Sequence, residues 1–564
     1  MIYAKLISAL DKCFPTGRIE DYRTVTSSYA YRNSVISLQI ALTADSQDPV
    51  RRFATFEVSG IPGDCVNFRL VEFVQSLMPV YPGRHDSGYI DTRPGLYPDI
   101  LAKLQNGGEA PVSGGILRTV WVDIDMKKIP DGYFPEGAEE AKVVFRVTSG
   151  EDSFDLPYTL RLIPADLPDH GMTVTEWFHC DCLAEWYHVP VFSEEHWRII
   201  ENFMRTYAEC GNNAVLTPVF TPPLDTRIGG ERPTVQLVGV KKGGNGRYYF
   251  DFTLLDRWIE TADRCGVKRF EISHLFTQWG AKHAPKVIAT LPDGSTEKIF
   301  GWETDSTGHE YVKFLRAFLK AFLAHMKARG DDKRCLFHIS DEPHEDQIEQ
   351  YLRAKESVAD LLEGYTVMDA LSNIAFFESG AVTTPVPSSN HIEPFISAFE
   401  ERGLTGRLWT YYCCGQCVGV SNRLIAMYGA RTRYIGLQFW KYRIAGFLQW
   451  GYNFYFNQGS RDLINPYIES SGYCWVPSGD AFSVYPAPGG TALESMRINH
   501  FREALEDLSA LRLCESLIGR ERLLAELEAV TGEIVFSKCE YDSGAMEGIR
   551  ALVDRLTSEA LRCR

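Results

Sequence analysis

Residues 334–344 read RCLFHISDEPH, and this stretch shows the pattern on which the fold rests. Its apolar side chains over 335–339 predict a short buried β-strand, and the spacing of apolar residues over 346–362 predicts a helix. Two acids, Asp341 and Glu342, stand where the strand ends. A strand that ends in polar side chains and leads into a helix is typical of the repeating unit of a (β/α)8 barrel.

The same strand-to-helix unit recurs from about residue 173 to residue 517. Eight strands are expected, over 173–181, 213–219, 269–275, 334–340, 365–371, 381–387, 407–413 and 446–453. Helical spacing follows at 193–210, 254–265, 310–329, 346–362, 373–378, 391–402 and 424–442, with a last helix at 493–517. Because eight strands each followed by a helix make a TIM barrel, we assign an α/β TIM barrel, (β/α)8, to residues 169–517.

The two flanks of the barrel differ from it. Residues 1–168 contain alternating, β-branched runs separated by Gly and Pro turns, at 34–43, 53–59, 66–74, 116–126 and 141–148. These runs predict an antiparallel β-sandwich domain. Residues 518–564 predict a short C-terminal helical extension packed on the barrel. Two long insertions, 220–249 and 283–307, separate a barrel strand from its helix, on the side where barrels build their sites.

The composition excludes several classes of protein. Hydrophobic residues make up 45% and aromatic residues 12% of the 564 positions, which is too apolar for a disordered chain. The net charge of −16 is the wrong sign for a nucleic-acid binder. We find no run long enough to span a membrane and no signal peptide at the N-terminus. Fourteen cysteines without a regular spacing favour a reduced, cytoplasmic location.

Polar and aromatic side chains gather at the predicted strand ends, where a barrel places its functional residues. Aromatic faces stack on the apolar face of a sugar ring, while carboxylates and amides bind its hydroxyl groups. Of Tyr411 and Tyr412, at most one should face the site, because neighbouring strand residues point to opposite sides. Packing in the core is the competing explanation for His274 and Trp450. The candidate substrate-binding residues are His179, Asp181, His274, Gln278, Trp279, Asp369, Tyr411, Tyr412, Trp450 and Asn453.

Asp341 and Glu342 are the candidate catalytic residues. Glycoside hydrolysis needs an acid that protonates the leaving oxygen, and retaining enzymes usually add a carboxylate nucleophile. The seventh predicted strand, where many barrel glycosidases carry that nucleophile, ends in WTYYC without an acid. Adjacent acids without a partner suit substrate-assisted catalysis, in which the substrate's 2-acetamido oxygen is the nucleophile. The competing explanation is that Ser-Asp-Glu-Pro only caps the following helix.

A metal site is a weaker alternative, and we expect neither a metal nor a cofactor. Cys180 and Cys182 on the first strand could approach Cys413, Cys414 and Cys417 after the seventh. Neither group has the paired spacing of a structural zinc site. The GGNG stretch at 243–246 lacks the strand–turn–helix context of a phosphate-binding loop.

Long segments of the chain resemble the catalytic domain of glycoside hydrolase family 123. The matching stretches are EWFHCDCLA, NNAVLTPVFTPPLDT, FEISHLFTQWGA, FHISDEP, LWTYYCCGQ, ARTRYIGLQFWKY, GFLQWGYNFY and GDAFSVYP. The resemblance implies a β-sandwich followed by a TIM barrel, and retaining β-N-acetylgalactosaminidase activity assisted by the substrate. It also implies that the family's paired acids are Asp341, which orients the acetamido group, and Glu342, which acts as acid and base.

We therefore predict an exo-glycosidase that removes terminal β-linked N-acetylgalactosamine from a glycan or glycoside. The same mechanism with N-acetylglucosamine is one alternative, since the two sugars differ only at the C4 hydroxyl. A glycan-binding protein without turnover is another. We expect neither a nucleic-acid nor a membrane partner, and the sequence leaves open whether the chain forms homo-oligomers.

Overall fold

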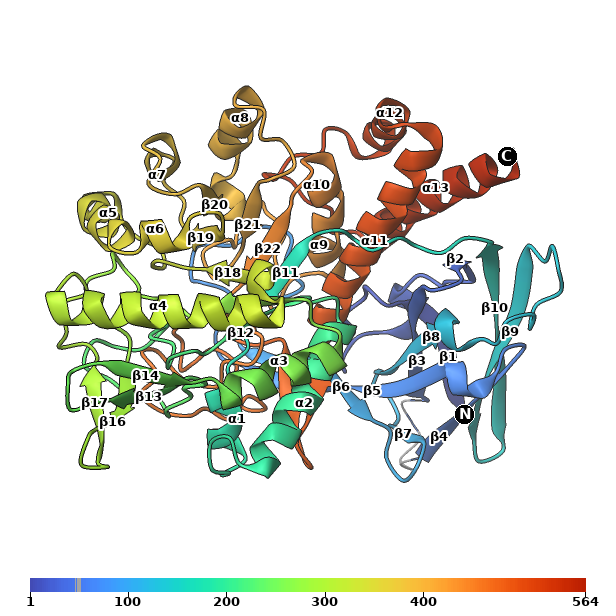
Figure 1. Cartoon of the computed structure of the whole chain (residues 1–564). Helices are drawn as coiled ribbons and strands as arrows, with labels where there is room; N and C mark the ends of the chain where they lie inside the picture. Colours follow the sequence, from blue (N-terminus) through green and yellow to red (C-terminus); the bar gives the residue numbers. More distant parts are fainter. Residues whose placement is uncertain (46, 48–51, 564) are drawn as a thin grey trace.

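The computed structural model describes residues 1–45, 47 and 52–563. The chain forms a β-rich N-terminal part, a barrel and a group of C-terminal helices that lies between and above the two (Figure 1). Among the described residues, no helix is long and apolar enough to cross a membrane.

Two five-stranded sheets make up the N-terminal part. The first has the order β1-β3-β8-β5-β6, with β1 at Ile2–Ser8, β3 at Val35–Ala44, β8 at Arg118–Asp125, β5 at Val66–Ser76 and β6 at Gly95–Lys103. The second has the order β2-β10-β9-β4-β7, with β2 at Ser27–Tyr31, β10 at Asp152–Ile163, β9 at Glu140–Ser149, β4 at Arg52–Ser59 and β7 at Glu109–Val112. One apolar core takes side chains from both sheets, among them Leu38 and Val122 of the first and Val143 and Leu160 of the second.

The five strands expected in this part are present as β3, β4, β5, β8 and β9, with shifted ends. Five others, β1, β2, β6, β7 and β10, were not predicted. The expectation of antiparallel pairing is wrong at one place, because β10 pairs with β2 in parallel, for example Leu160 with Ser28.

Eight parallel strands form the barrel, and they are the eight that the sequence predicts. In chain order they are β11 at Thr173–Glu176, β12 at Ala214–Thr217, β15 at Arg269–Ile272, β18 at Cys335–Phe337, β19 at Thr366–Ala370, β20 at Thr384–Val386, β21 at Trp409–Tyr411 and β22 at Gly446–Gln449. Thr173 of β11 pairs with Gly446 of β22, which joins the first strand to the last. A single parallel bridge, Ser388 with Tyr411, links the β20 side to β21 and nearly closes the barrel.

Helices surround this barrel (Figure 1). They are α1 at Cys180–Trp186, α2 at Glu194–Glu209, α3 at Thr253–Cys265, α4 at His309–Arg329, α5 at Ile348–Glu356, α6 at Ala359–Leu362, α7 at Ala375–Glu378, α8 at Glu393–Glu401, α9 at Gly429–Arg433, α10 at Ile435–Lys441 and α11 at Met496–Ile518. The helix expected over 424–442 is instead two short helices, α9 and α10. Residues 420–427 form a buried loop, because the side chain of Arg423 enters the barrel and binds Glu176.

The two predicted insertions pair with each other. The first supplies β13 at Gly239–Lys242 and β14 at Tyr248–Asp251, and the second supplies β16 at Val287–Thr290 and β17 at Thr296–Phe300. They form one sheet of order β14-β13-β16-β17, in which Lys241 pairs with Thr290. This sheet lies beside α4 (Figure 1). It therefore ties together the loops that follow β12 and β15.

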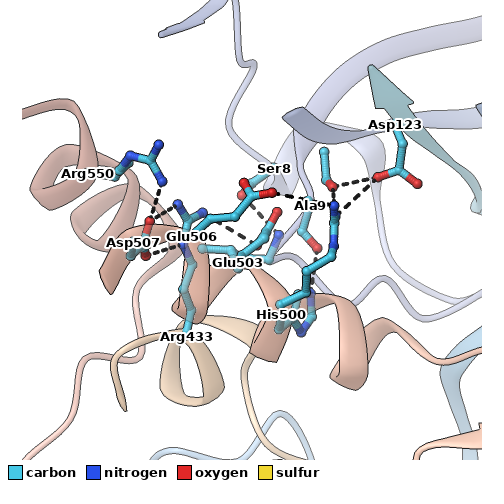
Figure 2. A network of polar contacts seen from close by, with 12 residues as sticks. Ser8, Ala9, Asp123, Arg433, His500, Glu503, Glu506, Asp507 and Arg550 are labelled. Atoms are coloured by element: carbon cyan, nitrogen blue, oxygen red, sulfur yellow. Dashed lines mark hydrogen bonds and ion pairs between the residues drawn. The ribbon is translucent and has the colours of Figure 1, made fainter. Parts of the chain in front are cut away.

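Buried ion pairs join the barrel to the N-terminal sheets. Arg497 of α11 binds Asp99 of β6 at 2.9 Å, and both side chains are fully buried. His500 of the same helix bonds the Ala9 carbonyl at 3.0 Å. Figure 2 shows the neighbouring network, in which Arg433 and Arg550 both bind Asp507 at 2.7 Å.

The C-terminal residues form α12 at Arg520–Thr531 and α13 at Ser543–Arg562. The α13 helix packs on α11 and also reaches the N-terminal sheets, where Tyr31 of β2 donates a hydrogen bond to Asp554 at 2.8 Å. The extension therefore contacts both larger parts of the chain.

Candidate active site

The segment after β18 carries Asp341 and Glu342, and three hydrogen bonds hold it against neighbouring parts of the chain. The Glu342 N–H donates to the Ala370 carbonyl at 2.9 Å, and the Asp341 carbonyl accepts from Trp279 N–H at 2.9 Å. The Ser340 hydroxyl donates to the Thr277 carbonyl at 2.9 Å. Glu342 has a φ of +41°, a conformation that is costly for a glutamate and that needs such support.

Asp369, at the end of β19, fixes the same segment with its side chain. One oxygen accepts from the N–H groups of Ile339 at 3.0 Å and Ser340 at 3.2 Å. The other accepts from the hydroxyl of Tyr351 on α5. Asp369 is fully buried, so its oxygens bind protein atoms instead of facing the solvent.

His338 lies beneath the two acids, in the barrel interior, between two buried carboxylates. Its Nε2 is 2.7 Å from Glu271 of β15 and its Nδ1 is 3.4 Å from Asp369. Burial lowers the pKa of His338, but Asp369 and Glu271 outweigh it and raise the pKa to about 10. The imidazole is therefore a positive charge under the catalytic segment at neutral pH.

Asp341 and Glu342 have different surroundings. Burial and the negative charge of Glu342 raise the pKa of Asp341 well above its usual range, with Asp225 adding to the effect and His338 opposing it. Within the described ranges no hydrogen bond reaches the Asp341 carboxylate. Glu342 is exposed, and its Oε1 accepts the hydroxyl hydrogen of Tyr411 at 2.6 Å.

Tyr411 and Tyr412 point to opposite sides of β21, as their adjacent positions predict. Burial and Glu342 raise the pKa of Tyr411 well above 10, so its hydroxyl keeps the proton that it donates to Glu342. Tyr412 is fully buried, with its ring edge against Phe447 at a centroid distance of 4.8 Å. Of the two tyrosines, Tyr411 therefore contacts the candidate acid Glu342.

The sequence analysis missed two further carboxylates, which lie in the loops after β12 and β22. Asp225 stands in the loop after β12, and burial and the charge of Glu342 raise its pKa to about 7 against the opposing charge of Arg232. Asp480 follows β22 and accepts from the Trp450 Nε1–H at 2.8 Å, and burial raises its pKa to about 7. Trp450 is thus oriented by Asp480 at the end of the last strand.

The predicted residues His179, Asp181 and Asn453 form a connected, buried group. Arg232, from the first insertion, binds Asp181 through two hydrogen bonds of 2.7 and 2.8 Å and contacts His179 Nδ1 at 3.1 Å. Asn453 bonds the backbone N–H and carbonyl of His179. Because protein atoms satisfy the hydrogen-bonding groups of these side chains, we infer that His179, Asp181 and Asn453 support the loops around the site.

The candidates after the third strand, His274, Gln278 and Trp279, differ in their burial and in their contacts. His274 is buried, stacks on His338 at 4.2 Å and has no hydrogen-bond partner on either ring nitrogen among the described residues. Burial and the charge of His338 lower its pKa well below 6.5, so it is neutral. Gln278 is buried and accepts from the Asp225 N–H at 2.8 Å. Trp279 is 42% exposed, next to Asp341.

The cysteines give the metal alternative no support. Cys180 and Cys182 are buried, and burial raises both thiol pKa values. Across the part of the chain that the structure describes, no three His, Cys, Asp or Glu side chains come together in a way that could hold a metal ion.

A comparison with protein families identifies this arrangement. The model described as glycoside hydrolase 123, catalytic domain, matches residues 177–514, which begin directly after β11 and include the other seven barrel strands and the whole Asp341–Glu342 segment. This match spans more than half of the chain. The chain belongs to glycoside hydrolase family 123. It is thus a glycoside hydrolase by family and acts on glycans.

Solved structures agree with the family 123 assignment at the level of the fold. A family 123 glycoside hydrolase from Clostridium perfringens, whose structural analysis concerned glycolipid glycan hydrolysis, superposes with a TM-score of 0.73 at 15% identity, over 100% of this chain and 98% of that one. An endo-β-1,4-mannanase from Thermotoga petrophila reaches a TM-score of only 0.34 at 11% identity, over 61% and 77% of the two chains, and carries no argument. No curated protein matches the sequence.

The sequence analysis missed several polar residues of the family 123 barrel, and a local pattern could have indicated only some of them. Glu271 and His338 are charged or titratable residues inside predicted buried strands, where such residues need partners. Asp225, Arg232 and Asp480 lie in long loops without periodicity, so no local pattern placed them near the barrel axis.

Proposed function

We propose that this family 123 glycosidase removes terminal β-linked N-acetylgalactosamine with retention, and that the substrate's 2-acetamido group is the nucleophile. The observation that carries the proposal is the bond between Tyr411 and Glu342. β21 ends in a tyrosine at the place where a two-carboxylate glycosidase would carry its nucleophile. A tyrosine hydroxyl whose pKa is raised keeps its proton and is a weak nucleophile, so we take the nucleophile from the substrate.

In this mechanism the acetamido oxygen attacks the anomeric carbon while the bond to the leaving oxygen breaks. Glu342 gives its proton to the leaving oxygen, and Asp341 accepts the acetamido N–H and stabilises the positive charge of the oxazoline that forms. Water then adds to the anomeric carbon while the bond from this carbon to the acetamido oxygen breaks, which restores the acetamido group, and Glu342 takes a proton from the water. Asp341 suits this role because its carboxylate has no protein donor among the described residues and stands over the charge of His338.

Substrate binding itself would prepare the pair for reaction. The raised pKa of Asp341 favours its protonated form in the free protein. An acetamido N–H that donates to Asp341 favours its ionised form. Binding of the substrate would therefore leave Asp341 as the carboxylate that this mechanism needs.

Aryl glycosides test the proposal directly. We expect cleavage of the aryl β-N-acetylgalactosaminide and no comparable cleavage of the aryl β-galactoside, which lacks the acetamido group. Equal rates on both would refute substrate assistance. Glu342→Gln and Asp341→Asn should each lower kcat on an unactivated glycoside by about 10²–10⁴-fold. Glu349→Gln on α5 removes an exposed carboxylate and is the matched control.

Two alternatives are decided by the same measurements. Preference for the aryl β-N-acetylglucosaminide over its galacto isomer would keep the mechanism and change the sugar. Binding of the sugar without cleavage of any aryl glycoside would indicate a glycan-binding protein. The intact Asp341–Glu342 pair and its contact with Tyr411 favour catalysis.

A further inference from the structure

In the loop after β12, hydrogen bonds fix the backbone of Asp225 in a strained conformation. Its N–H donates to Gln278 Oε1 at 2.8 Å, and its carbonyl accepts from the Ser460 hydroxyl at 2.9 Å. These two contacts come from the loops after β15 and β22, so three loops meet at this residue. Its φ of +49° is uncommon for any residue with a side chain, and such strain concentrates at functional sites.

Hydrogen bonds link Asp225 to the segment that carries the catalytic pair. Its N–H binds the side chain of Gln278, and the next residue, Trp279, donates its own N–H to the Asp341 carbonyl at 2.9 Å. The negative charge of Asp225 also raises the pKa of Asp341, and the charge of Glu342 raises the pKa of Asp225. The loop of Asp225 therefore lies against the loop that contacts Asp341.

The other buried carboxylates near the site already have protein partners. Asp181 binds Arg232, Asp369 binds two backbone N–H groups and Tyr351, and Asp480 binds Trp450. In the described ranges no hydrogen bond to the Asp225 carboxylate is found, although Arg232 is near enough to lower its pKa. The guanidinium of Arg232 is instead bonded to Asp181, His179 and the Leu224 carbonyl.

Gln278, whose side chain binds the Asp225 backbone, carries a buried donor without a partner among the described residues. Gln278 must present its oxygen to the Asp225 N–H, which fixes the orientation of its amide. The Nε2 atom of Gln278 is then buried and has no acceptor among the residues described. A buried amide that makes no hydrogen bond costs about 1–3 kcal/mol, so it calls for a partner that the protein chain does not supply.

We propose that Asp225 and Gln278 form a sugar-binding pair that recognises one ring hydroxyl group of the substrate. The hydroxyl donates its hydrogen to the Asp225 carboxylate and accepts a hydrogen from Gln278 Nε2. A hydroxyl group satisfies both at once, because it is a donor and an acceptor. A sugar that carries a sulfate at this position is rejected by the charge of Asp225. The inference rests on the proposed function for the identity of the sugar.

Binding measurements with deoxy sugars test this pair without relying on turnover. The ligands are methyl β-N-acetylgalactosaminide and its 3-, 4- and 6-deoxy forms, titrated by calorimetry into Glu342→Gln and into the double variant Glu342→Gln/Asp225→Asn. In the single variant we expect one deoxy sugar to bind about 10- to 100-fold more weakly than the parent. The double variant should lose part of that difference, because asparagine accepts a weaker hydrogen bond than a carboxylate, and Glu342→Gln/Asp225→Gly, which removes the acceptor, should lose most of it.

Unchanged deoxy penalties in the double variant would overturn the inference. Asparagine tolerates positive φ well, so the backbone should keep its conformation, and Asp225→Gly is the second variant if asparagine perturbs folding. Glu349→Gln in the same background should leave every penalty as it was. Cleavage of the aryl N-acetylgalactosaminide with unchanged penalties would refute only the Asp225 role, whereas failure to cleave any N-acetylhexosaminide would refute the proposed function.

Discussion

Tyr411 donates its hydroxyl hydrogen to Glu342 at 2.6 Å, and this bond connects the end of the seventh barrel strand to the acid that follows the fourth. The contact crosses the barrel mouth and orients a glutamate whose backbone is in an unfavourable conformation. It also leaves the second oxygen of Glu342 free of a protein donor within the described chain. The position of the proposed acid is therefore set by two strands at once.

Removing this hydroxyl should impair catalysis more than stability. We expect Tyr411→Phe to lower kcat on the aryl β-N-acetylgalactosaminide by about tenfold. A hydrogen bond to a charged group contributes about 1.5–3 kcal/mol, and water that replaces the hydroxyl recovers part of this free energy. Steady-state kinetics measure the loss. Tyr412→Phe is the control, because the Tyr412 hydroxyl has no partner among the described residues and points away from Glu342.

Asp369 should act through the backbone that it holds. In Asp369→Asn the amide nitrogen cannot accept hydrogen bonds, so either Tyr351 or the N–H groups of Ile339 and Ser340 lose a partner. We expect kcat to fall by at least tenfold while KM changes little, together with a loss of about 1–3 kcal/mol in the free energy of unfolding. Tyr351→Phe should show a smaller loss of stability and a smaller effect on kcat. An Asp369→Asn enzyme with full activity would contradict this role.

The charge of His338 predicts a pH dependence of stability. Its pKa is about 10 in the folded protein against 6.5 when unfolded, so its stabilising contribution is complete below pH 6.5 and is lost as the pH rises towards 10. His338→Gln leaves Glu271 and Asp369 buried without a counter-charge and should be strongly destabilising. Urea unfolding should show the largest difference from the wild type at pH 6 and a smaller one at pH 9.5. A difference that does not change with pH would show that His338 is neutral when folded.

The buried ion pair of Arg497 and Asp99 should stabilise the contact between the barrel and the N-terminal sheets. Arg497→Met leaves Asp99 buried and unpaired, which should cost about 3–5 kcal/mol of unfolding free energy. Replacing both residues with apolar ones should restore part of this loss. Arg146→Met breaks an exposed pair with Asp155 and should leave the unfolding midpoint unchanged in the same thermal scan.

Much of the barrel and its proposed catalytic pair could be predicted from the sequence, because the deciding information is local. The apolar run at 335–339 predicts a strand, and the spacing of apolar residues over 310–329 predicts a helix. A barrel then places the ends of its strands at one face. Asp341 and Glu342 follow directly from that rule. Alternation along a strand also predicts that at most one of Tyr411 and Tyr412 faces the site. The structure shows that Tyr411 is the one that contacts Glu342.

Only the tertiary structure decided how residues far apart in the chain meet. Asp225 binds Gln278, and Arg232 binds Asp181, through loops whose course no periodic pattern predicts. The pairing of β13 with β16 and the ion pair of Asp99 with Arg497 likewise join segments separated by dozens to hundreds of residues. Such contacts depend on how whole elements pack and on which buried charges find partners. These are properties of the assembled chain, while the order of strands and the position of the two acids are properties of its local sequence.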